Sequence, residues 1–284
     1  MIRIITDTTS VLPHQQLSDL DIPYLPQIII FGNDSYRDDS EIDTTTFLQK
    51  LRSSPTLPKT AAPPPALYNP IYQKYADIGE EMIVITPSAE LSGTYRSASL
   101  AANDFPQAKI HVIDSRTVAG GLGQFVLQAW EWAHQGFEID ALISHLSQMI
   151  PYNRTYFVVD TLEYLHKGGR IGGAQALFGS ILQVKPILTL RDGHIDPVET
   201  QRTKKRALAR MEELVMAECP KNQTARLAIS QCDAMDEAME LVSYFKEKLG
   251  FSDIPIYEAP PAIVVHGGPK IISISYCTAM NPES

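Results

Sequence analysis

Cysteine is scarce in this sequence, with only three residues in 284, and none of them forms a C-x-x-C pair. Such sparse, unpaired cysteines argue against a disulfide framework or a cysteine-based zinc site, and they favour a reducing cytosol. No H-E-x-x-H or comparable metal-ligand spacing occurs, so we expect no bound metal. The three cysteines are Cys219, Cys232 and Cys277.

Two nucleotide-binding signatures are also missing. The chain contains neither G-x-x-x-x-G-K-[ST] nor G-x-G-x-x-G, so we expect no nucleotide site of its own. Ser92 does not stand in a G-x-S-x-G elbow, which weakens the case for a hydrolase.

Long hydrophobic runs and excess positive charge are absent as well. No stretch approaches the eighteen apolar residues that a membrane span needs, and Asp7 ends the first apolar run too early for a signal peptide. The chain has 24 basic and 33 acidic residues, a net charge of −9, which disfavours nucleic acid as a partner. We therefore expect a cytoplasmic protein that does not cross a membrane.

The first half of the chain alternates short apolar runs with helical patterns. Apolar runs that end in polar turns predict strands, and the region 118–135 repeats its apolar residues at helical spacing. This alternation predicts a parallel sheet in a three-layer α/β/α domain over residues 1–150, with its ligand beyond the carboxyl ends of the strands. The predicted strands are 2–5, 82–85 and 110–113, and the predicted helices are 93–103 and 118–135.

The region 53–70 contains six prolines and is predicted to be an ordered crossing loop, neither helix nor central strand. Helical patterning stops near residue 151, so residues 151–284 are expected to form a second α/β domain. A hairpin turn at 191–193 predicts a mixed sheet there. The predicted strands are 156–159, 187–190, 226–229, 263–265 and 271–276.

The clearest helix of the second half spans residues 233–249. We expect Asp233 to cap its start and Gly250 to end it. Its predicted buried stripe consists of Met235, Ala238, Met239, Val242 and Phe245.

Three turns carry candidate site residues. The segment 161–173 surrounds Arg170 with four glycines, which suits an anion site and equally a helix C-cap with a solvated arginine. Ser92 precedes a helix, where it either meets an anion or simply caps the helix. His266 stands among glycines after an apolar run, either as a functional imidazole or as a structural donor.

Taken in order, the turns resemble those of the DegV family over essentially the whole chain. The resemblance implies two α/β domains that hold one long-chain fatty acid, such as palmitate, stearate or oleate, and a separate ATP-binding kinase subunit that makes acyl phosphate. It also implies a lipid site at the domain junction, peripheral membrane contact for lipid exchange, and no cofactor. The matching segments are 4–10, Thr60, 91–98, 112–115, 161–172, 185–188, 201–203 and 266–269.

The resemblance also implies roles for particular residues. Thr60, Ser92 and His266 match the family's carboxylate-binding side chains, with Gly93 and Gly267 beside them. Arg170 and Arg202 match arginines near the head group or the kinase-facing surface. Four positions depart from the family pattern and change the polarity around the head group: Ala61, Ala62, Gly267 and Lys270.

Two other functions stay open at this point. One is an esterase or acyl transferase with Ser92 as nucleophile and His266 as base. The other is a lipid-sensing interaction module that has no kinase.

Overall fold

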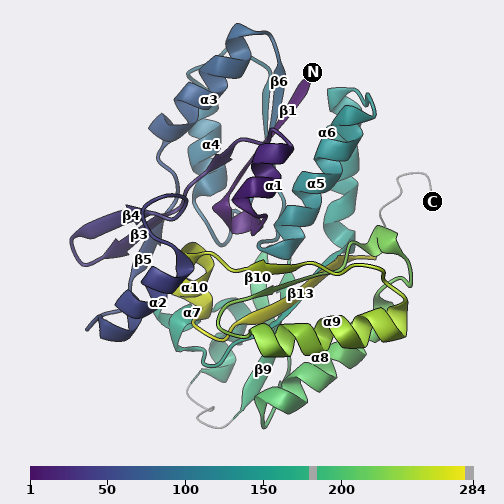
Figure 1. Cartoon of the computed structure of the whole chain (residues 1–284). Helices are drawn as coiled ribbons and strands as arrows, with labels where there is room; N and C mark the ends of the chain where they lie inside the picture. The colour runs from purple at the N-terminus through teal and green to yellow at the C-terminus, as the bar shows by residue number, and fades with distance from the viewer. Residues whose placement is uncertain (179–183, 279–284) are drawn as a thin grey trace.

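The structure, a computed structural model, describes residues 1–178 and 184–278. Its first sheet consists of four parallel strands in the order β2-β1-β6-β7, of which β1 and β6 are labelled in Figure 1. The parallel sheet predicted from the apolar runs is confirmed. The strands are β1 (Ile2–Asp7), β2 (Tyr24–Leu25), β6 (Glu81–Thr86) and β7 (Ile110–Asp114).

Helices cover both faces of this sheet. Alternate side chains of a strand point to opposite faces, so Ile5 packs against α3 (Pro65–Asp77) and α4 (Thr94–Ala102). Ile4 packs instead in the cluster of the opposite face. The result is a three-layer α/β/α arrangement. The helices of that opposite face are α1 (His14–Asp19), α5 (Gly120–His134) and α6 (Ile139–Met149).

The second sheet has six strands in the order β10-β9-β8-β13-β11-β12. Only β11 and β12 pair in parallel, so the sheet is mixed, as predicted. The predicted hairpin joins β9 to β10 through Asp192 and Gly193, both at positive φ. The strands are β8 (Asn153–Val158), β9 (Lys185–Arg191), β10 (His194–Gln201), β11 (Ala228–Gln231), β12 (Ile256–Glu258) and β13 (Ile272–Cys277).

The two faces of the second sheet have different coverings. One face packs against α8 (Lys204–Glu218) and α9 (Met235–Leu249). The other faces α7 (Glu163–Lys167), α10 (Pro261–Gly267) and the start of α5. Short 3-10 turns complete the chain: η1 (Thr8–Ser10), η2 (Ile150–Tyr152), η3 (Gly172–Leu177) and η4 (Gln223–Ala225).

A small antiparallel sheet lies beside these two, in the order β4-β3-β5, with α2 (Thr44–Ser53) against it. Its strands are β3 (Ile28–Phe31), β4 (Asp34–Arg37) and β5 (Lys59–Ala61). The η3 segment packs against β10, β5 contacts α10, and α5 contacts strands of both large sheets. We propose that the chain divides into two domains at residue 150. Within residues 1–178 and 184–278, no helix is long and apolar enough to cross a lipid bilayer.

Several local predictions were wrong. The region 53–70 is not only a loop, because it contains β5 and the start of α3. Residues 263–265 belong to helix α10 and not to a strand. Both α3 and α10 begin with a proline. The first N–H groups of a helix have no partner within the helix, so the N–H that proline lacks is not needed there.

The α9 prediction was correct in extent and partly correct in its buried face, since Ala238 and Phe245 are buried and Val242 packs against the same core. Met235 and Met239 are half exposed, while Leu241 and Leu249 are buried with Ala238 and Phe245. Asp233 does not cap the helix: Ala234 is the N-cap residue, and Gln231 Oε1 accepts its backbone N–H at 3.0 Å. Gly250 ends the helix at positive φ, as predicted.

Candidate functional site

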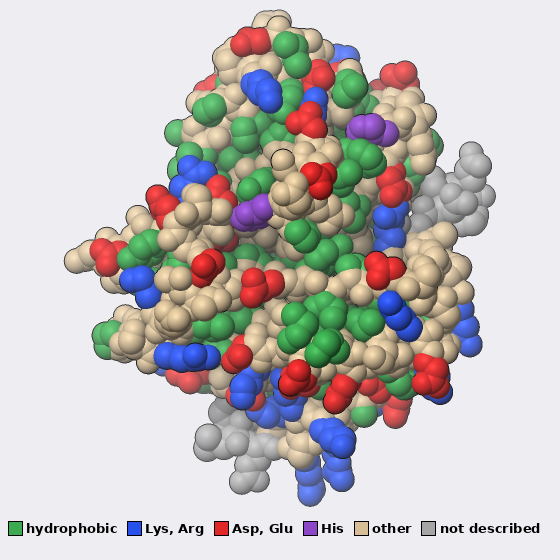
Figure 2. All heavy atoms as spheres, in the orientation of Figure 1, with side chains coloured by type: hydrophobic (Ala, Val, Ile, Leu, Met, Phe, Trp, Pro, Cys, Tyr) green, Lys and Arg blue, Asp and Glu red, His purple; other side chains and the backbone are tan. Residues whose placement is uncertain are grey.

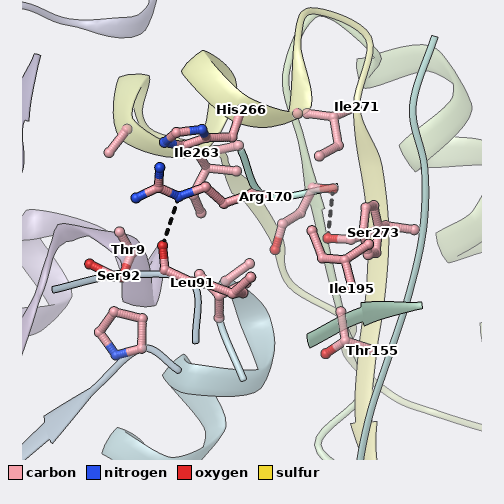
Figure 3. A pocket seen from close by; sticks show the side chains of 18 of the residues that line it. Thr9, Leu91, Ser92, Thr155, Arg170, Ile195, Ile263, His266, Ile271 and Ser273 are labelled. Atoms are coloured by element: carbon pink, nitrogen blue, oxygen red, sulfur yellow. Dashed lines mark hydrogen bonds between the residues drawn. The ribbon is translucent and has the colours of Figure 1, made fainter. Parts of the chain in front are cut away.

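A cavity lies between the open face of the second sheet and the turns that follow the parallel strands (Figure 3). Thr9 follows β1 and Ser92 follows β6, while Val118 and Ala119 follow β7. The cavity is therefore bounded by the carboxyl ends of the parallel strands, where a ligand was expected.

The lining of the cavity is mainly aliphatic and aromatic. Arg170 is the only permanently charged side chain among its described lining residues, and none of them is a carboxylate. An apolar body with one anionic end would match this lining. The apolar lining residues are Pro87, Leu91, Val118, Ala119, Phe157, Leu165, Leu190, Ile195, Ala259, Ala262, Ile263 and Ile271.

Thr60 and His266 meet at one side of the cavity, although 206 positions separate them in the chain. Thr60 is in β5 and His266 is near the end of α10, and Thr60 Oγ1 lies 2.8 Å from His266 Nε2. The other ring nitrogen, Nδ1, is buried and has no hydrogen-bond partner among the described residues. A Cβ atom at position 168 would overlap that nitrogen, so only Gly168 leaves room for the imidazole.

The environment of His266 disfavours its protonated form. Burial, and then the positive charge of Arg170, lower its pKa from 6.5 to about 4. The imidazole is therefore neutral at pH 7, with one nitrogen as a donor and the other as an acceptor. An anion bound nearby would favour the protonated ring and raise this pKa.

Arg170 is held by backbone carbonyl groups. Its Nε donates to Leu91 O at 3.0 Å (Figure 3), and its Nη1 donates to Gly168 O at 2.7 Å. Gly168 is also the C-cap residue of α7. The helix C-cap that was one of the two interpretations of the segment 161–173 is therefore present, and this glycine forms it. The arginine, in contrast, lines the cavity and ties the glycine turn to the turn after β6.

Ser92 belongs to a hydrogen-bonded chain at the start of α4. Its Oγ lies 2.8 Å from Thr94 Oγ1 and accepts from Thr94 N at 3.3 Å, while Gln27 Nε2 donates to Thr94 Oγ1 at 3.0 Å. Gly93 is the N-cap residue, so the expectation that Ser92 occupies this position was wrong by one residue. Ala62 packs beside Gly93.

Two buried carboxyl groups, Asp7 and Asp38, contact Gln27 of this chain. Asp38 Oδ1 accepts from Gln27 N at 2.8 Å and thereby orients Gln27. Burial raises the pKa of Asp38 to about 7 and that of Asp7 to about 6. Neither residue lines the cavity.

Arg202 lies apart from the cavity. It is exposed, in the turn between β10 and α8, and the structure does not bring it together with Arg170. A separate group of cations surrounds Asp160, where Lys185, Lys204 and Lys270 all lower the pKa of the carboxyl group. Along the lower edge of the molecule in Figure 2, Lys and Arg side chains are mixed with Asp and Glu side chains.

Three hydroxyl side chains in the cavity were not predicted from the sequence. They are Thr155, Ser230 and Ser273, all on the open face of the second sheet. The sequence did contain a signal for this group. In β13, Ser273 and Ser275 alternate with isoleucines, and the whole strand is buried, which indicates that one of its faces is polar. Thr9 and Gln27 also line the cavity and were not singled out.

The fold and cavity define a mixed α/β protein with an apolar, cation-bearing cavity between its two large sheets. The chain belongs to the DegV family, whose model, described as an uncharacterised protein of that family, matches residues 1–279. A DegV domain-containing protein of Streptomyces coelicolor is 34% identical over 96% of this chain and 97% of its own length.

Solved structures agree with this assignment. A DegV family protein from Thermus thermophilus, described as fatty-acid-binding, has a TM-score of 0.91 and 30% identity over 97% of this chain and 99% of its own. A DegV family protein from Ruminococcus gnavus, solved with vaccenic acid, has a TM-score of 0.84 and 26% identity over 96% of this chain and 98% of its own.

Proposed function

We propose that this protein binds one long-chain fatty acid and presents its carboxylate to a separate ATP-dependent fatty acid kinase. One observation carries the proposal: the apolar cavity has a single cation, Arg170, beside the Thr60–His266 pair, and no carboxylate among its described lining residues. Palmitate, stearate and oleate are the ligands we expect. The fatty acids described for the two solved relatives support this class of ligand.

The apolar lining would supply most of the affinity. Burial of a methylene group contributes about 0.8 kcal/mol, so a long acyl chain gains on the order of 10 kcal/mol. Ordering the chain and the cavity offsets part of this gain.

The carboxylate needs polar partners because desolvating it alone costs several kcal/mol. We propose that Thr60, Ser92 and His266 donate to it, together with the backbone N–H groups of Gly93 and Gly267. Hydrogen bonds to a charged acceptor are stronger than neutral ones. Arg170 adds a positive charge from the same side of the cavity.

The proposed kinase would supply the nucleotide, which agrees with the lack of a nucleotide motif in this chain. We assign Arg202 to the docking surface because it is exposed and does not line the cavity. Arg170 lines the cavity, so we assign it to the head group and to phosphoryl transfer.

The alternative of a Ser/His esterase has less support. Ser92 Oγ bonds to Thr94 and His266 Nε2 bonds to Thr60, and no hydrogen bond joins Ser92 to His266 among the described contacts. A nucleophile requires an adjacent base within hydrogen-bond reach. A lipid sensor without a kinase would use the same cavity and would differ only in its partner.

Native mass spectrometry of the purified protein tests the ligand. We expect one bound fatty acid, or uptake of added oleate by the delipidated protein. Ala262→Phe should block uptake because Ala262 is buried and lines the cavity. Ala217→Phe places the same ring on the exposed surface of α8 and should leave uptake unchanged. Absence of any acyl chain, with no uptake, would exclude the proposal.

The kinase step needs a second experiment. The loaded protein, mixed with a fatty acid kinase and ATP, should yield acyl phosphate. A covalent adduct between Ser92 and a fluorophosphonate probe, lost in Ser92→Ala, would instead support the esterase. Binding without acyl-phosphate formation would support the lipid sensor.

A further inference from the structure

The cavity has a second polar region, away from the Thr60–His266 pair. Thr155, Ser230 and Ser273 line it on the open face of the second sheet. In Figure 3, Thr155 and Ser273 lie across the cavity from Thr9 and Ser92, and the Arg170 guanidinium points away from them. The cavity thus has polar groups on two opposite sides.

Strand register gathers these hydroxyls into one patch. Ser230 of β11 pairs directly with Ser273 of β13, and Thr155 of β8 pairs with Ser275 of β13. The alternate residues of the same strands, such as Ile272 and Ile274, are buried isoleucines of the opposite face. The hydroxyls therefore occur selectively on the face that borders the cavity.

The hydroxyls of the patch are incompletely hydrogen-bonded. Thr155 Oγ1 lies 3.0 Å from Ser275 Oγ, and Ser273 Oγ donates to Ser230 O over a long 3.4 Å. Ser230 Oγ is buried in a residue that is only 2% exposed, and it has no partner among the described residues. A buried hydroxyl without a partner is unfavourable.

The start of α5 covers this patch closely. A Cβ atom at position 120 would lie 3.1 Å from Ser275 Oγ and 3.3 Å from Ser230 Oγ. Gly120 therefore permits the helix to lie directly over the hydroxyls. Ser230 is also a lining residue of the cavity, so a ligand in the cavity would lie beside its side chain.

We propose that the cavity selects a fatty acid whose acyl chain carries a hydroxyl or keto oxygen where it reaches Ser230 and Ser273. This inference rests on the proposed fatty-acid function and specifies its substrate class. A plain methylene chain would cover Ser230 Oγ and leave it unpaired. An oxygen on the chain would accept from Ser230 and regain the hydrogen bond that each group loses on leaving water.

The test compares stearate with a series of monohydroxystearates in which the hydroxyl moves along the chain. Dissociation constants are measured on the delipidated full-length protein. We expect at least one positional isomer to bind roughly ten-fold tighter than stearate, the effect of one buried hydrogen bond. Ser230→Ala should remove this preference by weakening that isomer, while the affinity for stearate stays within a few-fold.

Ser243→Ala is the matched control because Ser243 is exposed on α9, and both affinities should stay unchanged. If stearate binds at least as tightly as every hydroxystearate, the inference is overturned. This holds whether the hydroxyls of Thr155, Ser230 and Ser273 are then hydrated or left without a partner. A Ser230→Ala effect that is equal for both ligands would overturn it too. Failure of stearate and all its hydroxylated forms to bind would overturn the proposed function itself.

Discussion

The two faces of the second sheet contain alternate residues of the same strands, yet they differ in chemistry. The face toward α8 and α9 consists mainly of buried aliphatic side chains, among them Ile229, Ile272 and Ile274, with Tyr276 buried beside them. The cavity face has Thr155, Ser230 and Ser273 along with Phe157. We infer that one face stabilises the fold and the other accommodates a ligand. Substitutions on the two faces should therefore affect different measurements.

Ile274→Ala should have the largest effect on stability. Ile274 has no exposed surface, and truncation of such a residue typically costs about 2–5 kcal/mol. Urea denaturation should show this loss, while fatty-acid affinity per folded molecule stays similar. Its neighbour Ser273→Ala is the control and should lose less than about 1 kcal/mol. Equal losses in both variants would contradict the distinction between the faces.

His266 should make the protein less stable in acid. Its pKa is about 4 in the folded state and 6.5 unfolded, so the unfolded chain binds the proton first as the pH falls. The stabilisation is complete above pH 6.5 and is lost toward pH 4, by about 3 kcal/mol at most.

Urea denaturation of the wild type and His266→Gln at a series of pH values measures this difference. The variant has no titrating ring, so its stability should fall less between these pH values. Parallel curves would contradict the pKa shift. NMR titration should also show a higher His266 pKa when a fatty acid is bound.

Ser92→Ala should weaken fatty-acid binding moderately. Loss of one donor to a charged group costs about 1.5–3 kcal/mol, a factor of roughly ten to a hundred in the dissociation constant. Ser99→Ala on the same helix is the control because the Ser99 hydroxyl bonds only to Tyr95 O among its described contacts. Unchanged binding in Ser92→Ala would remove Ser92 from the head-group site.

Arg202→Ala should have the smallest effect on binding. Arg202 is exposed outside the cavity, so the dissociation constant should stay within a few-fold, whereas acyl-phosphate formation with the kinase should fall strongly. Arg96→Ala, another exposed arginine, is the control for loss of surface charge. Arg170→Ala should affect binding more, since Arg170 lines the cavity. A loss of binding in Arg202→Ala would contradict its assignment to docking.

Much of the fold could be predicted because its strands have clear local signals. Short apolar runs that end in polar turns correctly predicted β1, β6 and β7, and Asp192-Gly193 predicted the hairpin. The α10 segment could not be distinguished in this way. Its core, Ile263 to Val265, is apolar at every position, so it shows neither helical nor strand periodicity.

One contact in the candidate site was predictable because the resemblance to the family named both residues. Thr60 and His266, proposed from distant turns, do lie in hydrogen-bond contact. The close packing of Gly168 against the His266 ring could not be predicted, because the two residues are 98 positions apart and no local sequence pattern indicates such a contact. The hydroxyl patch likewise depends on strand register, which joins β8, β11 and β13 only in three dimensions.

Gly168 has a consequence for comparing this chain with its relatives. Its missing side chain is the space that the His266 ring occupies. Any larger residue at 168 would have to be accompanied by a smaller or reoriented residue at 266. The two positions should therefore vary together across related sequences, and a relative that has lost this glycine should be examined for a differently built head-group pocket.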